Sequence, residues 1–429
     1  MTNSFYIGCE WSSPSVSTPE VAETSAFIEI GVGNESATRC DNEFSGSVTN
    51  RVLLSAYPLA LWLASSWWRL RWESGQQRRE PSLDWKMSHS LAAAGGGFLW
   101  PALTFESDGE SIKVSMQSSG RVAYEPIKYL GQFTIWLGAD EFELVARQFI
   151  EKVLWRLTER GLPKTQLHDI WDELSMERAD SATAEFRRTE AILGFDAGEA
   201  PDEAIQRIDD LKISAGFAAA DEIAYASAGN PKQGQLTAAM VLKASVGAPA
   251  GRIDLRPEDF FVSGAGELYP WRRGYALASQ LRSRCGWSEP VVSDHQLAAL
   301  LGITPATLAS QNAAGRTLPF GLAVRASDRT GQDRFVFRSA VHVRRRFDAA
   351  RMLADHLLAP ASDTWLPTTA THTARQKTQR AFAAQLLCPY EALKDFMGDE
   401  ISDDQIEDAA LHFDVSFAAV KFQLANQRR

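Results

Sequence analysis

The hydrophobic pattern of this chain changes its period near Asp140, and this change limits the fold more than any other feature. Before it, alternating residues at Ser25–Val32 indicate a strand, and the turn dipeptide Asp108-Gly109 separates two short apolar segments, as in a β-hairpin. After it, apolar residues recur with the spacing of one helix face, starting with a helix capped at Asp140. The pattern predicts an α+β fold, with most strand signals in the first part of the chain and mainly helices after it, apart from strand-like segments at Leu318–Arg325 and Arg334–Arg338.

The length of 429 residues exceeds that of one ordinary domain, so we expect separately folded parts. We place a mixed α/β, Trp-rich domain at 1–138, a helical connector at 139–266 and a further domain at 267–429. Three long helices are expected in this last domain, at Arg345–Leu358, Thr373–Leu387 and Asp404–Asn426, the third with a break near Asp414.

Charge and cysteine content exclude several classes of protein. Lys and Arg number 44 against 54 Asp and Glu, a formal charge of -10, so the chain is not a polycation that coats nucleic acid. The four cysteines lie far apart without a CxxC pair, which argues against a disulfide scaffold and a zinc ribbon. The first residues do not form a basic and apolar leader, so we expect a cytoplasmic protein.

An uncharged stretch at 52–68 separates Arg51 from Arg69 and is at the lower length limit for a membrane span. Pro58 and the serines in this stretch favour a buried helix, and we expect no membrane contact. Tryptophans gathered here fit either a hydrophobic core or an aromatic site that stacks on a ligand, and they are Trp62, Trp67, Trp68, Trp72, Trp85 and Trp100. We favour the core, because tryptophan usually buries a large area.

Three sequence segments in the last third of the chain provide evidence about function. They read RRRFDAARMLADHLL at 344–358, RQKTQRAFAAQLLCPYEAL at 375–393 and AALHFDVSFAAVKFQL at 409–424. Together they resemble the ImmA/IrrE family of metallopeptidases, at Arg344, Phe347, Ala350, Phe382, Ala383, Leu386, Leu387, Pro389, Ala410, Phe413, Val415 and Ser416. The resemblance implies a zincin-like fold for 267–429. In that family a helix with the motif H-E-x-x-H binds zinc, and active members cleave helix-turn-helix repressors in stress response or mobile-element induction.

The metal chemistry of the family does not carry over to the matching positions. Arg351 and Asp355 stand where the motif has its two histidines, and Met352 stands where it has glutamate. Gln376 stands where the family has a further acidic ligand. An arginine has no lone pair for a metal, and a thioether is not a base near neutral pH. We therefore expect no cofactor, and a degenerate bacterial protein that binds a repressor-type protein partner in regulation, mobile-element biology or defence.

A shifted metal site is the alternative that would retain activity as a zinc metallo-endopeptidase. Asp355, His356 and His372, together with Asp363, offer oxygen and nitrogen ligands. On a helix, however, the neighbours Asp355 and His356 point about 100 degrees apart. This divergence favours the interpretation without a metal.

A second alternative is a transcriptional regulator that binds DNA. The segment SDHQLAALLGITPATLASQ, at 293–311, resembles a helix-turn-helix, with Ala298 and Leu301 packed inward. Thr304, Thr307 and Gln311 would then face a DNA groove. No Lys or Arg occurs in the second helix of this segment, which weakens the expected contact with phosphates.

Overall fold

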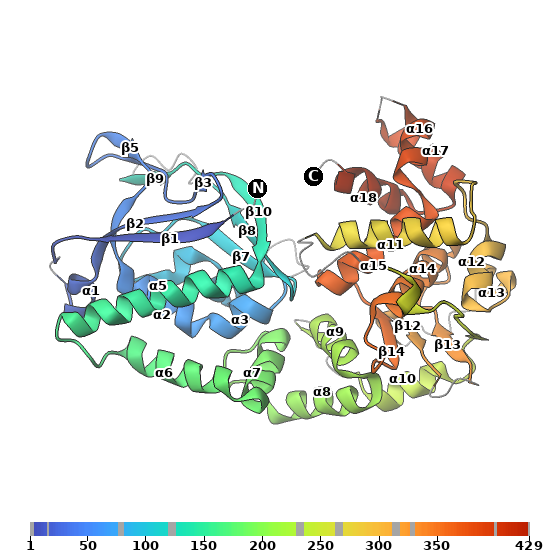
Figure 1. Cartoon of the computed structure of the whole chain (residues 1–429), viewed down its shortest axis with the longest axis horizontal. Helices are drawn as coiled ribbons and strands as arrows, with labels where there is room; N and C mark the ends of the chain where they lie inside the picture. Colours follow the sequence, from blue (N-terminus) through green and yellow to red (C-terminus); the bar gives the residue numbers. More distant parts are fainter. Residues whose placement is uncertain are drawn as a thin grey trace. The chain divides into compact units, whose positions relative to one another are not determined.

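The computed structural model describes residues 4–14, 17–75, 81–118, 126–228, 236–261, 269–310, 318–326, 331–398 and 401–427. The chain forms two compact units, 1–201 and 202–429, which can be followed by colour in Figure 1. Helices account for 53% of the structure and strands for 17%, which confirms the prediction of a mixed α+β protein. No helix in the described part of the chain is long and apolar enough to cross a membrane.

Small antiparallel sheets build the strand part of the first unit. In one sheet β2 (Ser25–Val32) pairs with β1 (Phe5–Trp11), β3 (Glu35–Ser36) and β6 (Val52–Ser55). A second sheet has the order β10 (Phe133–Gly138), β8 (Ser111–Met116), β7 (Leu103–Ser107), and a third has the order β5 (Ser47–Thr49), β4 (Cys40–Asn42), β9 (Ile127–Tyr129). The predicted strand at Ser25–Val32 and the predicted hairpin at Asp108 are both confirmed.

The uncharged stretch forms two helices in the core of the first unit, α2 (Ala56–Ser65) and α3 (Trp67–Trp72). Trp62 Nε1 donates to the carbonyl of Met87 (2.8 Å), and the ring of Trp67 packs edge-on against Trp171. Four of the six clustered tryptophans are buried, namely Trp62, Trp67, Trp85 and Trp100. Three of them, Trp62, Trp67 and Trp100, belong to the hydrophobic core of this unit.

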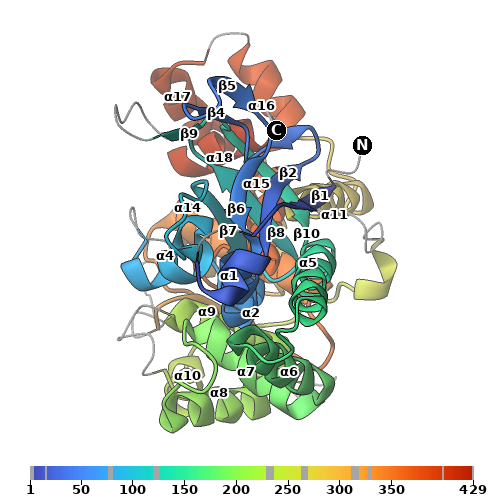
Figure 2. The ribbon, with the colours of Figure 1, turned by 90° about the vertical axis from the view of Figure 1, so that its left-hand side faces the viewer.

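The helices of the first unit cover its sheets. They are α1 (Pro19–Glu23), α4 (Leu83–His89), α5 (Ala139–Glu159), α6 (Gln166–Ala179) and α7 (Ser181–Leu193), with a 3-10 turn at Leu91–Ala94. The long helix α5 lies along β1, as Figure 1 and Figure 2 both show. Its buried side includes Phe142, Phe149 and Val153, in agreement with the predicted helical stripe.

The residues expected to form one helical connector divide between the two units. Helices α5 to α7 belong to the first unit, whereas α8 (Asp202–Ala215), α9 (Phe217–Ser227) and α10 (Ala238–Ser245) belong to the second. Helix α9 therefore packs in the unit that contains the three segments 344–358, 375–393 and 409–424. There it contacts strand β14 (Trp365–Thr368).

The second unit is built on one antiparallel sheet and the helices that pack on it. The strand order is β11 (Ala250–Gly251), β13 (Asp333–Val336), β12 (Gly321–Val324), β14. The helices are α11 (Pro270–Arg284), α12 (Asp294–Leu301), α13 (Pro305–Ala309), α14 (His342–Leu358), α15 (Ala374–Leu387), α16 (Tyr390–Met397), α17 (Asp403–Phe413) and α18 (Phe417–Gln427), with a 3-10 turn at Pro257–Asp259.

Helices α11, α14 and α15 pack closely around the core of this unit. At Gly274 of α11 an added Cβ would lie 2.5 Å from the carbonyl oxygen of Thr378, so the close approach of α11 to α15 requires glycine. The predicted break near Asp414 is confirmed, because this residue has a left-handed backbone (φ 52) between α17 and α18.

Candidate functional site

The positions that match the family motif come together where α14 faces α15. Arg351 of α14 donates through Nη2 to the side-chain oxygen of Gln376 on α15, and also to the carbonyl of Thr369. Asp355 lies one turn further along α14, beside Arg375. Met352 is fully buried in the hydrophobic core. The structure thus brings Arg351, Asp355 and Gln376 into one polar region and leaves Met352 outside it.

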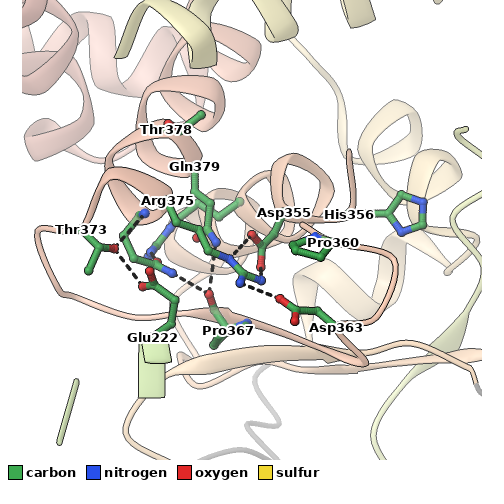
Figure 3. A network of polar contacts seen from close by, with 12 residues as sticks. Glu222, Asp355, His356, Pro360, Asp363, Pro367, Thr373, Arg375, Thr378 and Gln379 are labelled. Atoms are coloured by element: carbon green, nitrogen blue, oxygen red, sulfur yellow. Dashed lines mark hydrogen bonds and ion pairs between the residues drawn. The ribbon is translucent and has the colours of Figure 1, made fainter. Parts of the chain in front are cut away.

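Arg375 is the centre of this region. It holds both oxygens of Asp355 through Nε and Nη2 (2.7 and 2.8 Å), while its Nη1 binds Asp363 (2.8 Å). Figure 3 shows its guanidinium group between the two carboxyl groups, whose side chains are both fully buried. Burial by itself would lower the pKa of Arg375, but Asp355, Glu222 and Asp363 outweigh it and raise this pKa. Arg375 therefore stays protonated and ties α14 and the segment after it to α15.

Glu222 joins the network from α9, and the sequence did not single it out. Its Oε2 accepts a hydrogen bond from Thr373 Oγ1 (2.9 Å), and Thr373 also caps α15 by accepting from the Gln376 N–H (3.2 Å). Burial raises the pKa of Glu222 to about 7, although Arg375 opposes this effect. The one available signal was an acidic residue inside the alanine-rich segment 217–227.

A glycine places α9 against this region. Gly216, just before α9, has a positive φ of 94, and an added Cβ would lie 2.5 Å from Asp363 Oδ1. Backbone contacts join the same segments, because Thr364 N–H donates to the carbonyl of Ala215 (2.8 Å). Any larger residue at 216 would displace α9, and with it Glu222.

Side chains bind a carbonyl of β14, which is an end strand of its sheet, and a carbonyl just after it. The carbonyl of Pro367 accepts from Gln376 Nε2 (2.9 Å) and from Gln379 Nε2 (3.2 Å), and the carbonyl of Thr369, after the strand, accepts from Arg351. Proline has no N–H to offer a further strand. At Pro367, therefore, neither the carbonyl nor an N–H is available for an extended peptide that pairs with β14.

The network does not fit a metal ion. Both oxygens of Asp355 are engaged by Arg375, and Arg351 has no lone pair to donate. His356 donates through Nε2 to the carbonyl of Leu255 (3.0 Å) and is directed away from the network in Figure 3, while His372 is exposed. In the described ranges, Asp355, His356 and His372 do not form a group of three converging ligand atoms.

One such group of ligand atoms does occur among the described residues, formed by Asp294, His342 and Asp414. His342 Nε2 lies 2.8 Å from Asp294 Oδ2, and its Nδ1 lies 3.5 Å from Asp414 Oδ2. The buried Arg346 pairs with both aspartates, at 3.2 Å from Asp414 Oδ2. The Arg346 guanidinium already contacts both carboxylates. We therefore interpret the group as a set of ion pairs that joins α12, α14 and the turn before α18.

The helix-turn-helix-like segment forms the helix pair α12 and α13. Ala298 and Leu301 are buried, as predicted, and α12 begins with a complete capping box. Thr304 is the N-cap of the five-residue α13, and its hydroxyl lies 3.1 Å from that of Thr307. The carbonyl of Thr307 accepts a hydrogen bond from Arg345 (2.6 Å). Gln311 lies outside the described residues.

Comparisons of the chain with family models, with curated proteins and with solved structures give no match. The resemblance to ImmA/IrrE peptidases therefore depends on the sequence motifs alone.

Proposed function

We propose that this chain is a catalytically degenerate ImmA/IrrE-like protein whose second unit binds a protein partner without cleaving it. The observation that carries the proposal is the convergence of Arg351, Asp355 and Gln376 into a network of ion pairs and hydrogen bonds. Residues of α14 and α15 at the positions that match the family motif lie together, as the resemblance implies. Their side chains form ion pairs and hydrogen bonds, however, instead of a set of metal ligands.

The network supports a loss of hydrolysis for two physical reasons. Metal-assisted hydrolysis needs lone pairs that hold the ion and a base that accepts a proton from water. Arg351 offers no lone pair, and Met352 lies in the apolar core, so neither requirement is met at the matching positions. Arg375 instead joins α14 to α15 through Asp355, and this pairing needs no metal to hold the two helices together.

The partner class follows from the resemblance. Members of the family that remain active act on helix-turn-helix repressors, so a degenerate member is expected to retain such a repressor-type regulator as a bound partner. The setting that we propose is a regulatory role in the bacterial cytoplasm, in stress response or in association with a mobile element or defence system.

The proposal is tested by mixing the purified full-length chain with a purified helix-turn-helix repressor from the same genome. We expect a complex on size-exclusion chromatography in which both proteins keep their intact masses. Cleavage of the repressor that stops on addition of a chelator would contradict the proposal and restore the metallo-endopeptidase alternative.

A further inference from the structure

Two exposed arginines at the start of α14 are not used by the network. Arg338 lies just before the helix and Arg344 lies in its first turn. Asp348 follows Arg344 by four residues and so lies on the same side of the helix. Arg351 continues this side but is buried and belongs to the network, so we call Arg338, Arg344 and Asp348 the arginine face.

The arginines next to Arg344 in the sequence are engaged inside the unit, in contrast to Arg338 and Arg344. Arg345 and Arg346 turn inward, where Arg345 lies 4.7 Å from the centre of the Phe337 ring and Arg346 pairs with Asp294 and Asp414. Arg338 and Arg344 make no ion pair with any carboxylate in the described part of the chain. Arg338 and Arg344 are thus available to pair with a negative charge of another molecule.

Asp348 is the carboxyl group at the centre of the arginine face. Its side chain is 19% exposed, and its nearest charged contact is Arg351 Nη1 at 3.9 Å. Burial raises the pKa of Asp348 to about 6, against the positive charges of Arg351, Arg338, Arg344 and Arg345. Four arginines therefore act on this carboxyl group, and two of them, Arg338 and Arg344, form no ion pair with a carboxylate in the described part of the chain.

We propose that the arginine face binds an acidic peptide segment of the protein partner. The inference rests on the proposed function and deepens it, because it names the chemistry of the partner. Exposed guanidinium groups bind carboxylates in two-pronged geometry, and a local excess of positive charge attracts them. Recognition through side chains also agrees with β14, because its Pro367 carbonyl already accepts two side-chain hydrogen bonds and its proline offers no N–H to a further strand.

The net charge of the chain favours a short peptide over a nucleic acid. The formal charge of -10 opposes the approach of a long polyanion, whereas a short acidic segment meets mainly the local positive charge of Arg338 and Arg344.

Fluorescence anisotropy of a labelled Glu-rich peptide, with a Gln-rich peptide of equal length as reference, tests the inference on the full-length chain. The variant R338E/R344E reverses two exposed charges, and R39E/R147E makes the same change in net charge at exposed residues of the first unit. We expect the Glu-rich peptide to bind in a salt-dependent manner, and R338E/R344E to weaken the affinity by about tenfold or more. The control R39E/R147E should bind as the unchanged protein does, and circular dichroism checks that both variants fold.

The possible failures are distinct. Absence of binding, or equal binding by R338E/R344E, would overturn the inference but leave the proposed function in place if the repressor complex still forms intact. Binding of a short DNA duplex that is lost in the same variant, with no binding of the peptide, would instead assign the face to phosphates and also overturn it. Chelator-sensitive cleavage of the repressor would overturn the proposed function itself, whatever the peptide result.

Discussion

Each unit has a buried arginine that gathers carboxylates, and the two sites differ in how far those carboxylates are exposed. Arg375 binds Asp355 and Asp363, whose side chains are 0% exposed. Arg69 in the first unit binds three carboxylates whose side chains are 6%, 69% and 48% exposed, namely Glu73, Asp84 and Asp196. In the second unit, the arginine and its carboxylates are therefore enclosed by protein. In the first unit, two of the three carboxylates around the buried arginine are in contact with solvent.

This difference determines how each site responds when its arginine is lost. A carboxylate in contact with water recovers most of its solvation when the ion pair breaks, whereas a fully buried one does not. The Arg375 network is therefore stable only when it is complete, and opening it to admit a metal ion or water would leave two charges without partners. The following predictions, from the largest effect to the smallest, test this comparison.

Substitution of Arg375 by methionine is expected to have the largest effect. It leaves Asp355 and Asp363 buried without the guanidinium that is hydrogen-bonded to both, and breaking such a buried pair typically costs about 3 to 5 kcal/mol of unfolding free energy. Urea unfolding of the full-length chain, followed by a probe in the second unit, measures the loss. A loss below about 1 kcal/mol would mean that the buried pairs contribute as little as surface pairs do.

Substitution of Arg69 by methionine is expected to cost less, about 1 to 3 kcal/mol. Asp84 and Asp196 remain hydrated, and Glu73, whose pKa burial raises to about 7, takes up a proton readily. The same unfolding experiment with a probe in the first unit gives the value. If R69M destabilised its unit more than R375M destabilises the other, exposure would not be the deciding difference.

The pH dependence of stability should reveal the buried Glu222. Its pKa in the folded chain is about 7, against 4.5 for the ordinary side chain, so the folded state holds a proton that the unfolded state releases between these values. The free energy of unfolding therefore falls as the pH rises from about 4.5 to 7, by at most about 1.4 kcal/mol for each pH unit. In Glu222→Gln the curve should be flatter over this window, and parallel curves for the two proteins would contradict the assignment.

The smallest expected effect is on the binding of the acidic peptide. Substitution of Asp348 by asparagine removes the one negative charge of the arginine face and should tighten binding about threefold at pH 7.5. The unchanged protein should approach this affinity as the pH falls through about 6, where Asp348 becomes protonated, while the variant shows no such change. Tighter binding by the unchanged protein at the higher pH would reverse the sign that the face predicts.

Much of the fold could be predicted because it follows from local patterns. Alternating residues fixed β2, and the dipeptide at Asp108 marked a hairpin. The division of the chain into two units was harder to predict from the sequence. The helices of 139–266 have similar amphipathic patterns, and long-range packing decides which helix belongs to which unit. The contact of Gly216 with Asp363, which draws α9 to the second unit, joins residues that no local pattern connects.

The candidate site shows the same limit. The resemblance placed Arg351, Asp355 and Gln376 near one another, and the structure brings them together. It did not indicate that Arg375 holds Asp355 and Asp363 together, because Asp363 lies in a loop whose position the sequence pattern does not give. Glu222 was also missed, because its partners are about 150 residues away in the sequence.

Metal analysis of the full-length chain tests most directly the claim that ion pairs have replaced metal ligands at the site between α14 and α15. The protein is purified with added zinc, dialysed, and analysed for zinc, manganese and iron, with R375M as a comparison. We predict well below one equivalent of each metal in the unchanged protein. About one equivalent of metal that survives dialysis, and is lost when Asp355 or His356 is substituted, would contradict the account and identify a working metal centre.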